Sequence, residues 1–261
     1  NIVASASTGN SNLEVTPTLS AKTASGSTSI AGATNTVTGI LTAQMDSVPM
    51  LVLTGQTISP NLGKDAFQEA DVFGITAPIV KHSYILKNAN DIPRILKEAI
   101  HIATTGRPGP VVIDLPKDIV EKHPFTASLD QDMELPGYTL PPEPKKEDVQ
   151  HLAKLLSKSK RPLILAGHGC IISQAQPELR QLAETLQAPV TNTLLGKGSF
   201  PENHDLSVGM LGMHGTAYAS KAVAACDLIF SIGSRWDDRI TPANIQRFCP
   251  DAIKLHIDID P

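Results

Sequence analysis

The sequence has few aromatic residues, few cysteines and no long apolar run, and each shortage excludes a class of protein. Aromatic residues make up 4% of the 261 residues, so aliphatic side chains must supply most of any core. The three cysteines, Cys170, Cys226 and Cys249, are widely spaced and form no C-x-x-C motif, which argues against a disulfide scaffold and a zinc site. No apolar run is long enough to span a bilayer and no signal-peptide pattern follows Asn1, so we expect a soluble protein.

The chain carries little net charge, and it lacks several catalytic motifs. The formal net charge of -4 provides no basic surface of the kind that nucleic-acid binding requires. The P-loop motif, H-E-x-x-H and G-x-S-x-G do not occur, and the eight histidines lack the spacing of metal ligands. We therefore predict no metal-binding residues in this chain.

The first half of the sequence alternates apolar runs with helical stripes. Residues 50–54 and 110–115 are apolar runs typical of buried parallel strands, and residues 40–45 have helical character. A helix is predicted to start with a capping residue and an early proline at 90–93 and to end before Gly106. Its apolar stripe is Ile92, Ile95, Leu96, Ala99 and Ile100. Strand, helix and strand with short connections predict a parallel sheet.

The second half repeats this alternation. The predicted helices are 148–156, 178–186 and 216–225. The predicted strands are 163–166, 189–193, 227–233 and 253–259. Four strands alternating with helices predict a Rossmann-like domain, and a chain that stops at a strand end is expected to be truncated.

Composition divides the chain into four parts. Residues 1–30 are rich in Ser and Thr and are expected to be loosely packed, because they have little apolar surface to bury. Residues 31–120 form an incomplete parallel-sheet domain, and the proline-rich residues 121–145 form a linker. Residues 146–261 form the Rossmann-like domain, so the predicted fold class is α/β.

Candidate ligand residues lie at predicted strand ends, where an open α/β sheet leaves backbone N–H groups available to anions. Residues 167–169, 233–239 and 256–260 combine glycines, two arginines and Asp258, which suits a dinucleotide. A tight turn and a surface cluster of ion pairs are equally open interpretations. Residues 209–216 would suit a flat conjugated ligand, but their spacing alone favours a flexible loop with a capping Thr216.

Several strings occur in the order seen in thiamine-diphosphate-dependent enzymes. They are Gly32-Ala33-Thr34-Asn35, Asp46-Ser47-Val48-Pro49, Thr54-Gly55-Gln56, Asp65-Ala66-Phe67-Gln68-Glu69, Lys81-His82 and Gly106-Arg107-Pro108-Gly109-Pro110. Residues 209–216, 235–239 and 256–260 narrow the match to one branch. From Gly32 to Pro261 the chain resembles the acetolactate synthase (acetohydroxyacid synthase) large-subunit family.

The resemblance implies a transferase that condenses two 2-oxo acids, pyruvate with pyruvate or 2-oxobutanoate, in branched-chain amino acid biosynthesis. It implies thiamine diphosphate, magnesium and FAD as cofactors of the complete enzyme. Residues 31–120 would then be part of the domain that binds the pyrimidine of thiamine diphosphate, and residues 146–261 a truncated central FAD domain. The expected assembly is a homodimer with a possible regulatory subunit, without nucleic acid or membrane, in the bacterial cytoplasm or a plastid.

The resemblance also implies individual residue roles. The implied FAD contacts are Ser47, Arg107, Thr193, Leu194, Leu211, Gly212, Met213, His214, Gly233, Ser234, Arg235, Trp236, Asp237, Asp258 and Ile259. Gln68 resembles the family glutamine near thiamine diphosphate. The residues that resemble the lining of the substrate channel are Phe67, Lys117, Asp238 and Arg239.

The sequence departs from the family at four places. Nothing before Gly32 matches the segment with the catalytic glutamate, and Glu14 is no substitute. Ser29-Ile30-Ala31-Gly32 replaces the family's Ser-Gly-Pro-Gly, and His168 stands where the family has a glycine. The Gly-Asp-Gly magnesium motif is absent, so we expect no catalysis by this chain alone. The alternatives are a non-catalytic FAD- or nucleotide-binding module, a pseudoenzyme, or another carboligase of the superfamily.

Overall fold

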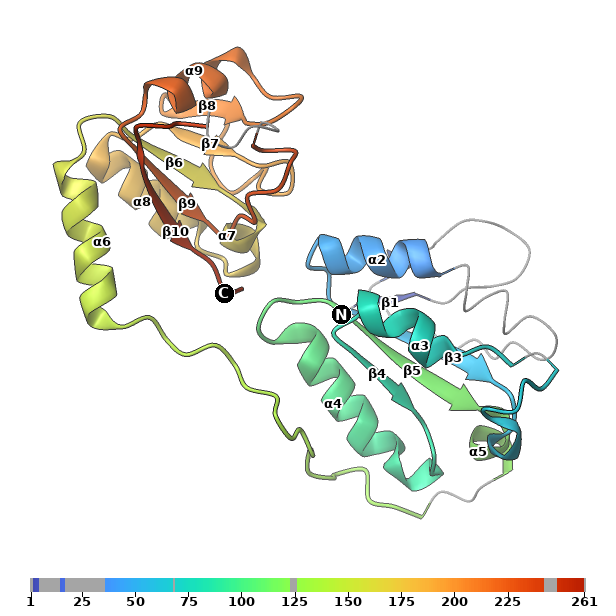
Figure 1. Ribbon diagram of the computed structural model, residues 1–261. Helices are drawn as coiled ribbons and strands as arrows, with labels where there is room; N and C mark the ends of the chain where they lie inside the picture. The colour runs from blue at the N-terminus through green and yellow to red at the C-terminus, as the bar shows by residue number, and fades with distance from the viewer. Residues whose placement is uncertain are drawn as a thin grey trace. The chain divides into compact units, whose positions relative to one another are not determined.

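The chain forms two compact units, residues 1–140 and 141–261. The computed structural model describes residues 2–4, 15–16, 36–67, 69–122, 126–241 and 248–260 (Figure 1). Most of the segment predicted to be loosely packed, residues 1–30, lies outside the described residues, as do the Gly32–Asn35 string, Glu14 and Gln68. Within the described residues, no helix combines the length and apolar character needed to cross a membrane.

The first unit is built on a five-stranded sheet with the order β2-β1-β3-β5-β4. Its strands are β1 (Ile2–Ala4), β2 (Val15–Thr16), β3 (Met50–Gln56), β4 (His82–Ile85) and β5 (Pro110–Pro116). Its helices are α2 (Val37–Met45), α3 (Val72–Thr76), α4 (Ile92–Thr104) and α5 (Lys117–Lys122), with short 3-10 helices η1 (Ser59–Asn61), η2 (Ala77–Ile79) and η3 (Ala89–Asp91). Only β2 pairs antiparallel among these strands.

The centre of this sheet is buried on both faces, as the apolar runs predict. Successive residues of β5 alternate between two cores: Val111 and Ile113 pack with α4, whereas Val112 packs with α2 and α3. Val111 and Val112 are fully buried. A strand covered on both faces needs apolar residues at every position, so the α/β prediction is confirmed here.

The predicted stripe of α4 is partly wrong. Ile100 is 39% exposed, whereas Ile95, Ala99, Ile102 and Ala103 are buried against the sheet. The buried face is rotated from the predicted one because it also contains a buried acid, described below, that an apolar stripe does not reveal.

The predicted start of α4 also differs in detail. The residues that precede the helix form η3, and Asn88 Oδ1 accepts a hydrogen bond from Asn90 N at 3.0 Å. The side chain of Asp91 makes no capping bond and lies 3.5 Å from Arg94 Nη2 instead. The chain therefore enters α4 through the 3-10 helix η3, which the side chain of Asn88 stabilises.

Glu98 is the buried acid of α4, and it ties three segments of the first unit together. Its side chain is 1% exposed. Oε1 accepts from Arg94 Nη1 at 3.0 Å and from Glu134 N at 2.7 Å, while Oε2 accepts from Tyr84 OH at 2.9 Å. Burial and the contact with Glu98 raise the pKa of Tyr84 far above its usual value. The carboxylate thus joins β4, α4 and the segment after residue 126.

That segment belongs to the stretch interpreted as a linker. Leu135 and Tyr138 pack against the core of the first unit, and Asn90 Oδ1 accepts from Thr126 N at 3.0 Å. Tyr138 OH lies 2.7 Å from Thr105 Oγ1 at the end of α4. Residues 126–140 therefore lie along α4 as part of the first unit.

The second unit has a five-stranded parallel sheet with the order β10-β9-β6-β7-β8. Its strands are β6 (Pro162–Ala166), β7 (Val190–Asn192), β8 (Ser207–Met210), β9 (Leu228–Ile232) and β10 (Ile253–Ile257). Its helices are α6 (Lys146–Lys158), α7 (His168–Ile172), α8 (Gln176–Leu186) and α9 (Ala217–Ala225). All predicted strands and helices of this unit occur, together with β8 and α7, which were not predicted.

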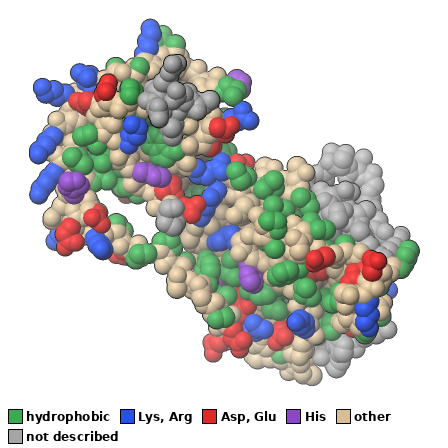
Figure 2. Space-filling view, viewed as in Figure 1, with side chains coloured by type: hydrophobic (Ala, Val, Ile, Leu, Met, Phe, Trp, Pro, Cys, Tyr) green, Lys and Arg blue, Asp and Glu red, His purple; other side chains and the backbone are tan. Residues whose placement is uncertain are grey.

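Helices cover both faces of β6, the central strand of this sheet. Leu163 and Leu165 pack with α9, and Ile164 packs with α8 on the opposite face. Leu156 of α6 packs on β9. Acidic side chains occupy the first turn of α6 and Lys158 its last turn, which matches the helix dipole, and Figure 2 shows this change from red to blue along the helix.

We predict that Glu98→Ala lowers the free energy of unfolding of the first unit by about 1–3 kcal/mol, because it leaves the half-buried donors of Arg94 and Tyr84 without their shared acceptor. Hydrogen exchange of the β4 and β5 amides in the full chain measures this loss. The matched control is Glu121→Ala, which removes only an exposed partner 3.9 Å from Lys117 and should leave the exchange unchanged. Equal protection in both variants would contradict the role given to Glu98.

Candidate functional site at the carboxyl edge of the second sheet

The ends of β6 and β9 touch through their backbones. A Cβ placed on Gly167 would lie 2.0 Å from Gly233 O, and one on Gly169 would lie 2.6 Å from Gly233 Cα. Gly233 has φ +60, which other L-residues rarely adopt. Gly167 N donates to Ile232 O at 2.8 Å and Gly169 N to Gly233 O at 3.0 Å. These glycines are therefore explained by a close crossing of two chain segments.

The loops that follow β7 and β8 are held to this edge in the same way. A Cβ on Gly196 would lie 2.3 Å from Ala166 O, and one on Gly212 would lie 2.3 Å from Arg239 O. Met213 N also donates to Arg239 O at 3.0 Å. Four loops that are distant in sequence thus meet where the parallel strands have their carboxyl ends, here called the carboxyl edge. This is the position where parallel α/β sheets bind ligands.

The loop of residues 167–169 differs from the prediction. Residues 168–172 form α7, so His168 begins a short helix immediately after the crossing at Gly167. The glycine spacing alone is typical of a turn, and the helix was missed because it has a single turn.

Predicted FAD contacts with apolar side chains fall into two groups. Leu194, Met213 and Ile259 are 68%, 64% and 49% exposed on the loops of this edge. Leu211 is 5% exposed and packs in the core with α9. The exposed side chains form apolar surface that a flat ring can cover, whereas Leu211 acts through packing.

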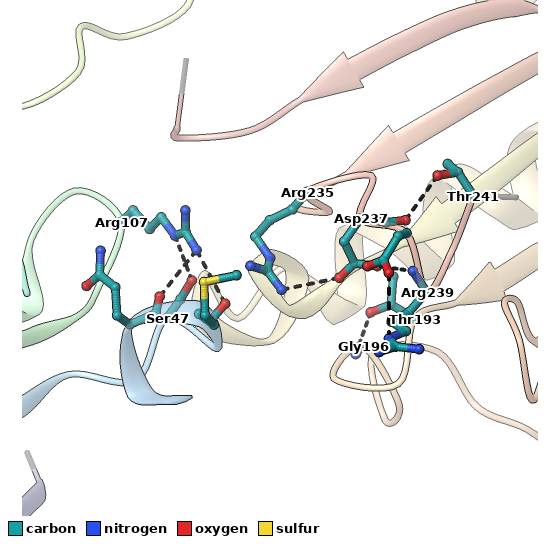
Figure 3. Close-up of polar contacts among 11 residues, drawn as sticks. Ser47, Arg107, Thr193, Gly196, Arg235, Asp237, Arg239 and Thr241 are labelled. Carbon is teal, nitrogen blue, oxygen red and sulfur yellow. Dashed lines mark hydrogen bonds and ion pairs between the residues drawn. The ribbon is translucent and has the colours of Figure 1, made fainter. Parts of the chain in front are cut away.

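Thr193, His214 and Thr216 have separate positions in these loops. Thr193 Oγ1 accepts from Gly196 N at 3.0 Å and so closes the turn after β7 (Figure 3). His214 is exposed beside Met213. Thr216 Oγ1 accepts from Ala219 N at 3.1 Å, which confirms it as the cap of α9.

Residues 235–239 form an ion-pair loop after β9. Arg235 Nη2 lies 3.2 Å from Asp237 Oδ2, and Asp237 Oδ1 accepts from Arg239 N at 3.1 Å (Figure 3). Asp237 O accepts from Thr241 Oγ1 at 3.1 Å. Asp238 and Arg239 are mostly exposed and lie 3.9 Å apart. The loop is thus held by its own carboxylate and presents Arg235 at the edge.

An aromatic contact joins this loop to the end of β10. Trp236, at φ +59, packs edge-on against Phe248 and His256. His256 Nε2 lies 2.9 Å from Ser234 O, the geometry of a ring N–H donating to a carbonyl, and 3.6 Å from Asp258 Oδ2. Asp258 Oδ1 accepts from Asp260 N at 3.0 Å. Ser234 and Asp258 are therefore brought together through His256.

Two predicted FAD contacts, Ser47 and Arg107, lie in the first unit and contact each other. Arg107 Nε donates to Ser47 Oγ at 3.0 Å, and Nη2 donates to the carbonyls of Gln44 and Met45 at 3.3 Å each (Figure 3). Arg107 therefore places its charge at the carboxyl end of α2, where the helix dipole favours a cation.

The predicted channel residues of the first unit are exposed. Phe67 is 88% exposed, and Lys117 lies at the start of α5. Asp118 Oδ1 accepts from Ser59 N at 2.8 Å and links α5 to η1. Gln68, the predicted neighbour of thiamine diphosphate, lies outside the described residues.

A buried polar cluster at the end of β3 and β5 was missed as a candidate site. Asp114 is 1% exposed, with Oδ1 accepting from Thr54 Oγ1 at 2.8 Å and Oδ2 from Gln56 Nε2 at 2.9 Å. Burial raises the pKa of Asp114, and the two hydrogen bonds oppose this rise. Gln56 Nε2 also donates to Ala70 O at 2.7 Å. The signal in the sequence was an aspartate within an apolar strand run.

Sequence profiles of two domains match this chain. The profile described as "Thiamine pyrophosphate enzyme, N-terminal TPP binding domain" matches residues 24–75. The profile described as "Thiamine pyrophosphate enzyme, central domain" matches residues 149–261, which include all the loops of the second-unit edge.

Curated relatives match nearly the whole chain. An acetolactate synthase large subunit from Parasynechococcus marenigrum is 51% identical over 90% of this chain, and one from Buchnera aphidicola subsp. Schizaphis graminum is 49% identical over 90%. A probable acetolactate synthase large subunit from Methanocaldococcus jannaschii is 50% identical over 90%. The chain spans 38%, 41% and 40% of the length of these three relatives.

Proposed function

Because the chain belongs to the thiamine pyrophosphate enzyme family, we propose that it serves as part of an acetolactate synthase large subunit. The observation that carries this proposal is the identity of about half of the aligned residues over 90% of the chain, across both units. The proposed reaction is the decarboxylative condensation of pyruvate with pyruvate or 2-oxobutanoate in branched-chain amino acid synthesis. The proposed setting is a homodimer with a regulatory subunit, in the bacterial cytoplasm or a plastid.

Within this proposal, the first unit contributes to the binding of thiamine diphosphate. When bound, thiamine diphosphate supplies the electron sink that decarboxylation of a 2-oxo acid requires. The chain's own contribution is the buried cluster of Asp114, Thr54 and Gln56, which holds the carbonyl of Ala70 and so orients the segment with Phe67. We propose Gln68 as a contact of thiamine diphosphate, and Phe67, Lys117, Asp238 and Arg239 as channel residues. Magnesium is proposed only for the complete enzyme.

The carboxyl edge of the second sheet is proposed to bind FAD. The chemistry of the edge fits this ligand: Leu194, Met213 and Ile259 offer exposed apolar surface to a flat ring. Arg235 offers a guanidinium to a diphosphate, and the Asp258 carboxylate offers an acceptor to ribose hydroxyls. The backbones of residues 211–214 and 233–237 flank these groups. Ser47 and Arg107 are proposed separately as FAD contacts, on the family resemblance alone.

Binding of FAD is tested by titrating the full chain and following quenching of flavin fluorescence. We predict that Arg235→Ala weakens binding about 10-fold or more, because a charge-assisted hydrogen bond to phosphate is lost. Arg180→Ala is the matched control, since Arg180 also sits in an exposed pair, 2.8 Å from Glu184, but on α8. Equal affinities for Arg235→Ala and Arg180→Ala would contradict the site, and no binding by the unaltered chain would remove the FAD proposal.

The enzymatic role is tested by a chimera. The segment of the Parasynechococcus marenigrum relative that aligns with this chain is replaced by the chain's own residues, and formation of acetolactate from pyruvate is measured. We predict that the chimera forms acetolactate, because the exchanged segment keeps both units intact. The isolated chain is the control and should form no product, since its sequence contains no Gly-Asp-Gly magnesium motif. A folded chimera that binds FAD without forming product would favour the non-catalytic module.

A further inference from the structure

Cys226 and Cys249 are neighbours in the fold, although residues 227–248 lie between them in the sequence. Cys226 is the C-cap that follows α9, and Cys249 lies in the turn before β10. The parallel strands β9 and β10 bring these points together: Leu228 is in register with Ile253, and Ile253 N donates to Asp227 O at 2.9 Å. Both cysteines pack in one core cluster with α9.

The two thiols interact directly, and their surroundings make them unequal. The contact with Cys226 is the main cause that lowers the pKa of Cys249, and the charge of Lys254 adds to it. Lys254 Nζ donates to Cys249 O at 3.1 Å, so this ammonium is held beside the residue. The same contact and burial raise the pKa of Cys226. A lowered pKa favours the thiolate form of Cys249, so Cys249 is taken as the attacking thiol and Cys226 as the resolving thiol.

Cys170, the third cysteine, provides a comparison with this pair within the same chain. It is buried in a different core cluster, with α8, and burial raises its pKa to about 11. Its Sγ lies 3.5 Å from Ile232 O. Cys170 therefore stays protonated near neutral pH and packs in a cluster that contains no second cysteine among the described residues.

We propose that Cys226 and Cys249 form a redox-active dithiol that a small peroxide oxidises to a disulfide. The Cys249 thiolate attacks one oxygen of hydrogen peroxide, breaks the O–O bond and becomes a sulfenic acid, releasing hydroxide that takes up a proton to form water. Cys226 then attacks the sulfenic sulfur, forms the S–S bond and releases a second water. Two electrons pass from the two thiols to one peroxide, which is reduced to two waters.

The burial of Cys249 favours a small oxidant over a large one. Cys249 is 3% exposed, which disfavours attack on a bulky disulfide, whereas Cys226 is partly exposed. The disulfide would fix the end of α9 to the start of β10. It would also close a covalent ring that contains β9 and the loop with Arg235 and Asp237. Oxidation would therefore restrict the backbone of a loop in the proposed FAD site.

The test is peptide mapping of the full chain after treatment with hydrogen peroxide. We expect the intact mass to fall by about 2 Da, the count of free thiols in denaturant to fall from three to one, and a crosslinked peptide to contain Cys226 and Cys249. Dithiothreitol should restore all three thiols. Cys226→Ser and Cys249→Ser should each abolish the crosslink, whereas the matched control Cys170→Ser should retain it.

Three outcomes would overturn the proposal. They are a crosslink that includes Cys170, sulfinic acid on Cys249 without any crosslink in the unaltered chain, and three unchanged thiols after treatment. Because the mapping of the unaltered chain does not depend on any variant folding, each of these results is decisive on its own.

Discussion

The close contact between the backbones of β6 and β9 at their carboxyl ends is the constraint on which the second unit depends. It exists only because Gly167, Gly169 and Gly233 lack side chains, and Gly233 adopts a conformation that other residues avoid. This contact determines where α7 begins and where the loop with Arg235 leaves the sheet. The loops after β7 and β8 then attach through Gly196 and Gly212 by the same kind of contact. Close backbone contacts thus hold together the loops of the edge that is proposed to bind FAD.

The sequence predicted those parts of the fold that local pattern determines. The runs that became β5, β6 and β9 are buried on both faces, so nearly every residue is apolar and each run is conspicuous. Strand β8 was missed because its residues, Ser207–Met210, are only half-buried at the sheet edge and include a glycine. The buried face of α4 was misjudged at Ile100 because Glu98 occupies part of it, held by groups from β4 and from residue 134.

The sequence could predict which strand ends contribute to the candidate site. It could not predict which residues contact one another there. The sequence places glycines and charges at 167–169 and 233–239, but only the fold shows that the glycines meet one another. The contact between Arg107 and Ser47, and that between Cys226 and Cys249, joins residues far apart in the chain. Such contacts follow from strand order and register, which no local pattern encodes. The Asp114 cluster is of the same kind, because its partners come from a neighbouring strand.

The loops at the carboxyl edge of the second sheet are proposed to form one ligand site for FAD. Hydrogen exchange of the full chain, measured with and without saturating FAD, tests it most directly. We expect FAD to slow exchange in the loops of residues 193–198, 211–215 and 233–239 together, with the amides of α6 and α8 unchanged. Slower exchange confined to other segments, or no change on adding FAD, would contradict it.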